Sequence, residues 1–213
     1  MKNGKEADKL YMTLREEGHA VYEEKRSEFF GFAMHVENEQ DAQSLIRRIR
    51  EAHYDARHHV YAYVLGGGVI QRYSDDGEPQ GTGGMPVLEV LRKSGLDDAC
   101  VVVTRYFGGI LLGAGGLVRA YTAAAKLAIE AAGIITYERY AAFRLMLSYS
   151  EYQKLLARLP DFGAILDGAD FADTVTLRTA VRAKDTARFL HGICELFSGR
   201  VIAEKIGERY DKA

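Results

Sequence analysis

Three carboxylates stand close together in a segment rich in turn-forming residues. Asp75, Asp76 and Glu78 fall within the sequence SDDGEP at residues 74–79. Grouped carboxylates can hold Mg²⁺ through oxygen, or divide acid and base duties if burial separates their pKa values. Two structural interpretations compete with this chemistry: Asp side chains in turns accept backbone N–H groups, and the acids can pair with Arg105 or Arg119.

A second candidate lies where a glycine-rich segment leads into an alanine-rich helix expected over residues 117–132. Gly113, Gly115 and Gly116 come directly before it. Free N–H groups and the helix dipole at such a position favour an anion. The segment is not a Walker A loop, since no Gly-Lys-Ser/Thr follows, and it lacks the dinucleotide-binding fingerprint. The glycines could equally serve only to let the helix pack closely on a sheet.

Two arginines flank this glycine-rich segment. Arg105 and Tyr106 end an apolar strand pattern, and Arg119 stands at the start of the following helix. Two guanidinium groups beside one loop could bind a single phosphate bidentately. Ion pairs with the carboxylates of residues 75–78 compete with that role.

Histidine and cysteine give weaker signals. Adjacent His58 and His59 in an extended segment point to opposite faces and cannot easily share a metal ion. The sequence therefore predicts no metal site and no resident cofactor. Cys100 lies in an apolar strand pattern and Cys194 on an apolar helical stripe, so both are expected to be buried and unreactive. Two distant cysteines also make a disulfide framework or a structural zinc site unexpected.

Alternating and helical patterns predict the elements that position these residues. In the first part of the chain Asn38 caps a helix with apolar positions 42, 45, 46 and 49, and Pro86 lies in the first turn of a helix that ends at Gly95. The expected strands are residues 18–25, 28–36, 60–65, 69–74 and 99–106.

The last third of the chain has a different pattern. Residues 140–148 alternate as a strand, and helices are expected over 151–159 and 185–197. Strands are expected at 164–166 and 173–181, joined by a turn around Gly168, with a final strand at 200–206. The order β-α-β-β-α-β is that of the split βαβ, or ferredoxin-like, motif. We therefore predict an α+β protein with two domains, residues 1–136 and 137–213.

Composition limits the classes of protein. With 47% hydrophobic and 27% charged residues among 213, the chain can bury a core. It contains no apolar run of about eighteen residues, so no membrane span is expected. The first eight residues are polar with no signal peptide, which predicts a cytoplasmic protein. The net charge of −2 argues against bulk coating of DNA, although a local basic patch stays compatible with it.

Two long motifs resemble the IMPACT family, in particular its bacterial YigZ-like branch. They are SDDGEPQGTGGMP at residues 74–86 and VVVTRYFGGILLGAGGLVRAY at residues 101–121, supported by KRSEF at 25–29 and ARHHVYAY at 56–63. The resemblance covers essentially the whole chain. It implies a first domain like domain IV of elongation factor G, a ribosomal-protein-like α/β sandwich. The second domain is implied to be ferredoxin-like and similar to domain V of the same factor.

The resemblance implies a function linked to RNA or translation. Eukaryotic relatives regulate translation through an additional N-terminal domain, so that role is not expected to carry over. We expect a non-enzymatic protein that binds RNA or the ribosome, with Tyr73 or Tyr106 available for base stacking. The predicted anion- and nucleic-acid-binding residues are Arg105, Tyr106, Gly113, Gly115, Gly116, Arg119, Lys93 and His58.

Two other roles stay open at this point. The C-terminal domain could dock a protein partner, because ferredoxin-like sheets often pack against other proteins. Alternatively the chain is an enzyme that cradles a phosphate ligand in its glycine-rich loop and uses Asp75, Asp76 and Glu78 with Mg²⁺.

Overall fold

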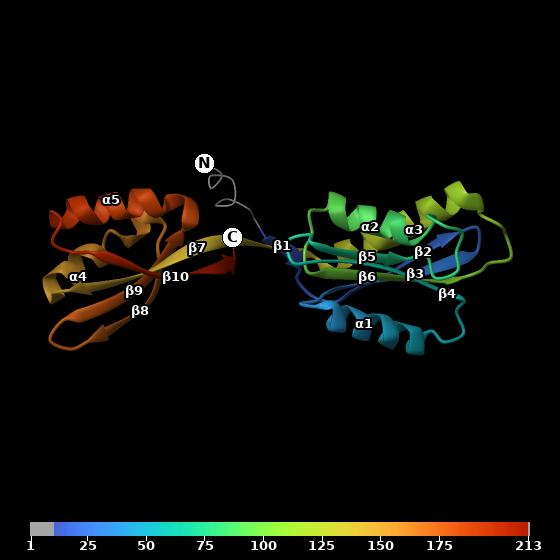
Figure 1. Ribbon diagram of the computed structural model, residues 1–213, viewed down its shortest axis with the longest axis horizontal. Helices are drawn as coiled ribbons and strands as arrows, with labels where there is room; N and C mark the ends of the chain where they lie inside the picture. Colours follow the sequence, from blue (N-terminus) through green and yellow to red (C-terminus); the bar gives the residue numbers. More distant parts are fainter. Residues whose placement is uncertain (1–10, 213) are drawn as a thin grey trace. The chain divides into compact units, whose positions relative to one another are not determined.

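The computed structural model describes residues 11–212 and divides into two compact units (Figure 1). The N-terminal unit spans Met12–Ile135, and the C-terminal unit comprises Tyr11 together with the residues from Thr136 onward. Strands β1 (Tyr11–Leu14) and β7 (Ile134–Leu147) both cross this boundary. The polar segment at the very start of the sequence lies outside the described residues.

A five-stranded sheet forms the centre of the N-terminal unit. Its order is β2-β3-β6-β4-β5, and every neighbouring pair is antiparallel. All five strands match expected segments to within two residues at each end. Their bounds are β2 (Gly18–Glu24), β3 (Ser27–His35), β4 (His58–Leu65), β5 (Ile70–Ser74) and β6 (Ala99–Tyr106).

Helices cover both faces of this sheet. Helix α1 (Glu39–Ala52) packs on one face, and α2 (Gly84–Lys93) and α3 (Gly113–Ala132) pack on the other (Figure 1). Because strand side chains alternate, central β6 must be apolar on both sides. Its Val101 and Val103 join the core under α2 and α3, while Cys100 and Val102 join the core under α1.

The start of α1 follows its sequence signals closely. The Asn38 side chain accepts the Asp41 backbone N–H at 3.0 Å, as expected of an N-cap. The apolar positions of the predicted stripe are all buried, which confirms that prediction: Ala42, Leu45, Ile46 and Ile49.

Helix α3 begins four residues before its predicted start. Gly113, Gly115 and Gly116 form its first turn instead of a preceding loop. Small residues let α3 lie very close to the sheet, since a Cβ added at Gly31 would stand 2.7 Å from the Ala124 carbonyl oxygen. Low helix propensity marked the glycines as a loop, and tertiary packing overrides that propensity.

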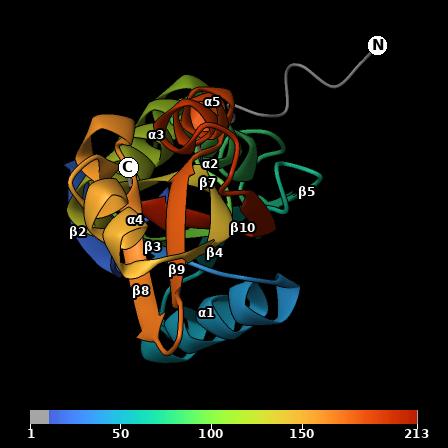
Figure 2. The ribbon, with the colours of Figure 1, turned by 90° about the vertical axis from the view of Figure 1, so that its left-hand side faces the viewer.

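The C-terminal unit has the predicted β-α-β-β-α-β order, which is confirmed. Strand β9 lies between β8 and β7, and β7 also pairs with β10 and β1. Helices α4 and α5 contribute to the same core cluster and so cover one face of these strands (Figure 2). The bounds are α4 (Tyr149–Leu156), β8 (Ile165–Phe171), β9 (Val175–Arg182), α5 (Thr186–Phe197) and β10 (Ala203–Lys212), with short 3₁₀ turns at Leu159–Phe162 and Ala183–Asp185.

Two predictions in this unit are wrong. Gly168 lies inside β8, where the register shifts against β9, and the turn falls at residues 172–174. A glycine within a strand marks such a bulge as readily as a turn. Cys194 is exposed, because the buried stripe of α5 is Phe189, Ile193 and Phe197, and Cys194 lies one position away from it.

Within residues 11–212, no helix combines the length and the apolar character that crossing a bilayer requires.

Candidate functional site

One end of the N-terminal sheet gathers the segments that the sequence singled out. We call it the loop end and define it by residues 25–26, 53–57, 75–83 and 107–112. The strand register places three pairs of residues near this end: Glu28 opposite Tyr106, His58 opposite Arg105, and Tyr61 opposite Ser74. Helices α2 and α3 both begin here, directly after the acidic loop and the glycine-rich loop.

Asp75 organises the acidic loop through backbone hydrogen bonds. Its carboxylate accepts the N–H groups of Gly81, Gly83 and Gly84 at 2.8, 3.0 and 2.8 Å. Gly84 is the first residue of α2, so one side chain closes the loop and satisfies a free amide at the helix start. This is the turn-forming role that the sequence left open beside metal binding.

Asp76 connects the same loop to the sheet and to α1. It accepts the His59 backbone N–H at 2.7 Å and pairs with Arg50 at 2.6 Å. Its carbonyl oxygen lies 2.9 Å from Nδ1 of His58. His58 therefore contacts the acidic loop.

Glu78 points inward and forms a buried triad with Arg105 and Tyr121. Nη1 of Arg105 and the Tyr121 hydroxyl each lie 2.7 Å from the same Glu78 oxygen. The Glu78 and Arg105 side chains are only 3% and 8% exposed. Burial, followed by the nearby Glu78 charge, raises the pKa of Tyr121 far above its ordinary value, so it stays a hydrogen-bond donor.

The Arg105 guanidinium lies between two aromatic rings. It is 5.5 Å from the ring centroid of Phe29 and 5.6 Å from that of Phe107. Its Nε is buried and has no hydrogen-bond partner among the described residues. The triad ties the acidic loop to β6 and α3, and a phosphate could reach Arg105 only after this packing opened.

The three carboxylates thus face different partners. Asp75 bonds backbone amides, Asp76 bonds Arg50, and Glu78 bonds Arg105. Across residues 11–212, no three side chains of His, Cys, Asp or Glu gather in a way that could hold a metal ion. The arrangement favours the two structural interpretations of the loop over magnesium chemistry.

The buried titratable groups near the sheet serve packing. Nδ1 of His59 lies 3.0 Å from the Thr104 hydroxyl, and burial lowers the His59 pKa. Burial also raises the pKa of the Cys100 thiol well above its usual range, in agreement with an unreactive cysteine.

Tyr106 lies on the sheet face that α1 covers, opposite to the face that carries Arg105. Its hydroxyl donates to Asp55 at 2.8 Å and lies 3.0 Å from Nδ1 of His53. Burial, with help from Asp55, raises its pKa to about 12. The two adjacent residues therefore do not form one binding surface.

Exposed cations without partners lie on the outer side of the loop end. Lys25, Arg26, Arg57 and Arg119 are exposed, and none of them forms an ion pair with another residue of the described part of the chain. Arg26 precedes β3, Phe107 follows β6 and Arg57 precedes β4. Since β3, β6 and β4 are neighbours in the sheet, these positions are separated by roughly one strand spacing of about 5 Å each.

Two of these segments touch. A Cβ added at Gly108 would lie 2.0 Å from the Arg26 carbonyl carbon, and the Gly108 N–H donates to the Ser27 hydroxyl at 3.1 Å. Lys25 and Arg26 have φ values of 49° and 65°, typical of the two central residues of a type I′ hairpin. A tight turn thus holds two cations beside the glycine-rich loop.

Exposed aromatic rings accompany the cations. Phe107 is 55% exposed, and Tyr54 is 86% exposed in the segment that precedes β4. Nη1 of Arg119 lies 3.6 Å from a Cβ added at Gly115, so this guanidinium stands beside the first turn of α3. That turn has no side-chain cap, which leaves N–H groups and positive charge on the same surface.

The structure distributes the predicted anion-binding residues over several places. Arg119, Gly113 and Gly115 are exposed at the start of α3 and Gly116 is buried there, whereas Arg105 and His58 contact the acidic loop. Lys93 lies at the other end of α2 from that loop. Tyr73, also considered for stacking, is 44% exposed in β5.

The cations of residues 25, 26 and 57 were not identified from the sequence as binding residues. Their motifs KRSEF and ARHHVYAY were noticed only as part of the resemblance. The available signal was a Lys-Arg pair between two strand patterns, where a tight turn must point its side chains outward.

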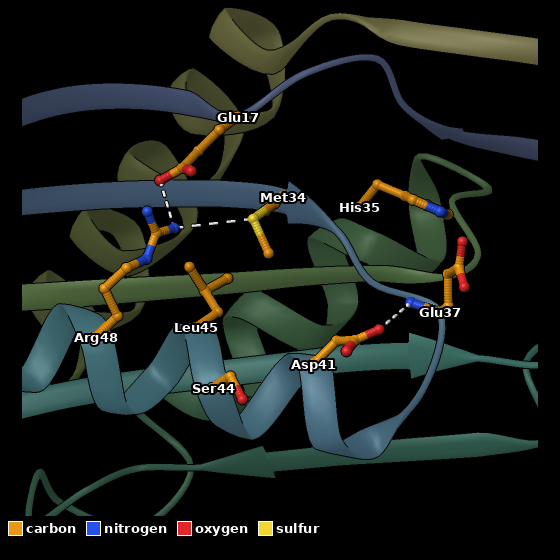
Figure 3. A pocket seen from close by; sticks show the side chains of 8 residues that line it. All are labelled: Glu17, Met34, His35, Glu37, Asp41, Ser44, Leu45 and Arg48. Atoms are coloured by element: carbon orange, nitrogen blue, oxygen red, sulfur yellow. Dashed lines mark hydrogen bonds and ion pairs between the residues drawn. The ribbon is translucent and has the colours of Figure 1, made fainter.

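A separate hollow lies beside α1 on the other face of the sheet (Figure 3). Its volume is about 450 Å³. Figure 3 shows Arg48 pairing with Glu17 beside Met34, and Asp41 near the Glu37 backbone. The Arg48–Glu17 pair is 2.7 Å long, and Asp41 accepts the Glu37 backbone N–H at 3.2 Å. Three carboxylates against one arginine make this hollow acidic, so it does not suit a nucleic acid.

Comparisons with known proteins cover most of the chain. The family described as Impact N-terminal domain matches residues 25–129, and a domain of unknown function (DUF1949) matches residues 145–200. The IMPACT family member YvyE of Bacillus subtilis is 37% identical over 191 residues, covering 89% of this chain and 88% of the relative. The IMPACT family member YigZ of Escherichia coli is 34% identical over 182 residues, covering 84% and 89%.

A solved structure supports the same comparison. A crystal structure titled as that of a hypothetical protein has a TM-score of 0.59 and 31% sequence identity. The match covers 93% of this chain and 98% of that one, so both units are included.

Proposed function

Because the chain belongs to the IMPACT family, we propose that it is a cytoplasmic, non-enzymatic protein linked to translation, which binds single-stranded RNA through the loop end. The observation that carries the proposal is a set of exposed cations, without ion-pair partners among residues 11–212, beside an exposed ring. Lys25, Arg26, Arg57 and Arg119 supply the charge, and Phe107 supplies the ring.

Each part of this surface matches a known contribution to RNA binding. Cations gain affinity by displacing counterions from phosphates. Exposed aromatic rings stack on unpaired bases with little sequence preference. The uncapped start of α3 adds N–H donors and a positive dipole beside Arg119.

The net charge of −2 does not oppose this surface. Screening limits long-range repulsion to about 8–10 Å at physiological salt, so the local charge determines the contact. Many acidic residues are engaged in ion pairs of their own, among them Glu17 and, within the loop end itself, Asp76 and Glu78.

The proposal includes the likeness of the two units to domains IV and V of elongation factor G. A ribosomal RNA strand is then the natural setting for the contact, and free single-stranded RNA is the simplest probe of it. The enzymatic alternative receives less support, because Asp75, Asp76 and Glu78 are already engaged with internal partners.

Fluorescence anisotropy with a labelled single-stranded RNA tests the proposal across a series of salt concentrations. The variant is Arg26→Ala/Arg119→Ala. Its matched control is Arg47→Ala/Arg188→Ala, which removes the same charge from exposed positions outside the loop end. Removing two phosphate contacts should lower the slope of log K against log salt by about 1.4 for a single strand.

Two results would refute the proposal. One is an absence of salt-dependent binding by the wild-type protein even at low salt. The other is an unchanged slope in Arg26→Ala/Arg119→Ala together with a loss in the control. Far-UV circular dichroism of each variant verifies that it folds.

A further inference from the structure

A groove runs between α2 and α3 on the side of these helices that faces away from the acidic hollow of Figure 3. Its volume is about 600 Å³, within the range of small-molecule sites. Both helices begin at the loop end and pack on the same face of the sheet (Figure 1). Its lining includes Met85, Pro86, Lys93, Val118, Thr122 and Lys126.

The lining residues recur at the spacing that places side chains on one face of a helix. Met85, Glu89 and Lys93 are four residues apart in α2, and Val118 and Lys126 belong to a matching series in α3. Because both helices start at the same end, the two series have the same direction. The groove is therefore apolar towards the loop end and basic towards the other end.

Within the described residues, neither lysine at the basic end is held in an ion pair. Lys93 and Lys126 are exposed, and neither forms an ion pair with any residue in the described range 11–212. Glu89 is the carboxylate of the groove, and it pairs with Arg92 at 2.7 Å. The Ser94 hydroxyl lines the same end and adds a hydrogen-bonding group.

The acidic hollow of Figure 3 provides a contrast within the same unit. Its arginine is neutralised by Glu17 at 2.7 Å, so its charges are already partly balanced. Two ammonium groups that share a groove without such a partner repel each other, and an anion placed between them relieves this repulsion.

We propose that this groove binds a small amphipathic anion, a carboxylate, sulfonate or phosphate on an apolar body. The anionic group lies between Lys93 and Lys126, and the apolar body lies on Met85, Pro86 and Val118. The basic end of the groove is the end of α2 remote from the acidic loop, so Lys93 and Lys126 lie apart from the RNA contact, whereas the apolar end reaches Gly81 of the loop end. Lys93, predicted from the sequence as a nucleic-acid contact, thereby belongs to a different site.

Two probes that share the anionic group but differ in the apolar body test this inference. They are decanoate, followed by isothermal titration calorimetry below its micellar range, and 1-anilinonaphthalene-8-sulfonate, followed by fluorescence. Both should bind the full-length protein at one site and compete with each other. Decanol, which has the same chain and no charge, should bind at least about tenfold more weakly than decanoate, because it lacks the charge-assisted contacts.

Variants separate the two ends of the groove. Lys93→Ala/Lys126→Ala should lower the affinity for both anionic probes by about tenfold or more and abolish the preference for decanoate over decanol. Lys93→Arg/Lys126→Arg should retain that preference. Val118→Asp should lower the affinity for all three probes, because it places a charge where the apolar body lies. The charge-matched control Arg47→Ala/Arg188→Ala should bind like the wild type.

Three results would overturn the inference. They are no saturable binding of either anion, equal affinity for decanoate and decanol, or binding that survives both Lys93→Ala/Lys126→Ala and Val118→Asp. The lysines and Val118 are exposed or partly exposed, so these variants should fold, and thermal melting verifies it. The salt slope for RNA binding should be unchanged in the lysine variant, which keeps this test independent of the proposed function.

Discussion

The acidic loop of residues 75–83 and the glycine-rich loop of residues 107–112 lie at the same end of one sheet and differ in where their polar groups point. In the acidic loop, Asp75, Asp76 and Glu78 each have a partner inside the protein. Around the glycine-rich loop, the cations face solvent without an ion-pair partner in the described part of the chain, and the Phe107 ring, although it lies beside the Arg105 guanidinium, is more than half exposed. The acidic loop, which holds the carboxylates that could have been catalytic, is thus the structural loop. The two loops are distinguished by whether their polar groups have partners inside the protein.

The buried Glu78–Arg105 pair explains why the acidic loop is fixed in place. Two charges removed from water are tolerated only while each has the other and further hydrogen bonds. Tyr121 supplies one such hydrogen bond at 2.7 Å. If the loop left the sheet, Arg105 would stay buried without a partner. This cost favours a fixed structural loop over a mobile binding loop.

The largest effect is expected from breaking this pair. Glu78→Ala or Arg105→Ala should lower the free energy of unfolding by about 3–5 kcal/mol, because each leaves the other charge buried and alone. Urea denaturation followed by circular dichroism measures the loss. Glu78→Leu/Arg105→Leu should cost less than the sum of its two single Leu variants, since no charge stays behind. A loss below about 1 kcal/mol in both single variants would show that the loop is not fixed by the pair.

Asp75→Ala should have the next largest effect on stability. It removes the acceptor for three backbone N–H groups, those of Gly81, Gly83 and Gly84, and should cost about 1–3 kcal/mol. Asp173→Ala, in the exposed turn between β8 and β9, is the control and should change stability by less than about 0.5 kcal/mol. Equal effects in the two variants would remove the assigned role of Asp75.

Phe107→Ala tests the outward side of the comparison. The substitution should weaken the binding of single-stranded RNA by about 1–3 kcal/mol, because base stacking on the ring is lost. Its effect on unfolding should be smaller, because the ring is more than half exposed. Anisotropy and urea denaturation of the same sample measure both. A variant that loses stability but binds RNA normally would place Phe107 with the structural residues.

The smallest expected effect concerns pH. Burial lowers the pKa of His59, so the folded state holds its neutral form while the unfolded chain takes up a proton near pH 6.5. The contribution of His59 to stability is therefore full above that pH and decreases as the pH falls below it. His59→Gln should flatten the stability profile between pH 7.5 and about 5.5. A steeper dependence of stability on pH in the variant would contradict a lowered His59 pKa in the folded state.

The sequence predicts those features that depend on periodicity. The strands of the N-terminal sheet and the buried stripe of α1 follow from alternation and helical spacing, so their prediction succeeds. The start of α3 and the bulge at Gly168 do not, because glycine can serve a turn, a bulge or a close helix contact. The exposure of Cys194 depends on one residue position around α5, which an apolar run does not resolve.

The candidate site was harder to predict than the fold. The sequence places Arg105 and Arg119 at the two ends of one loop, yet it does not say that Arg105 points into the core while Arg119 faces solvent. Arg26 and Arg57 become neighbours of Phe107 only through the strand order β3-β6-β4, which is a long-range property. Lys93 is also positively charged, but it lies at the end of α2 that is remote from the loop end.

The most direct test of the central claim is an NMR titration of the ¹⁵N-labelled full-length protein with single-stranded RNA at low salt. We expect the amide shifts to concentrate at residues 25–26, 54–57 and 107–119. Signals of residues 75–83 should move less, because their polar groups are engaged inside the protein. Shifts confined to the C-terminal unit, shifts centred on the acidic loop, or none at all would contradict the account.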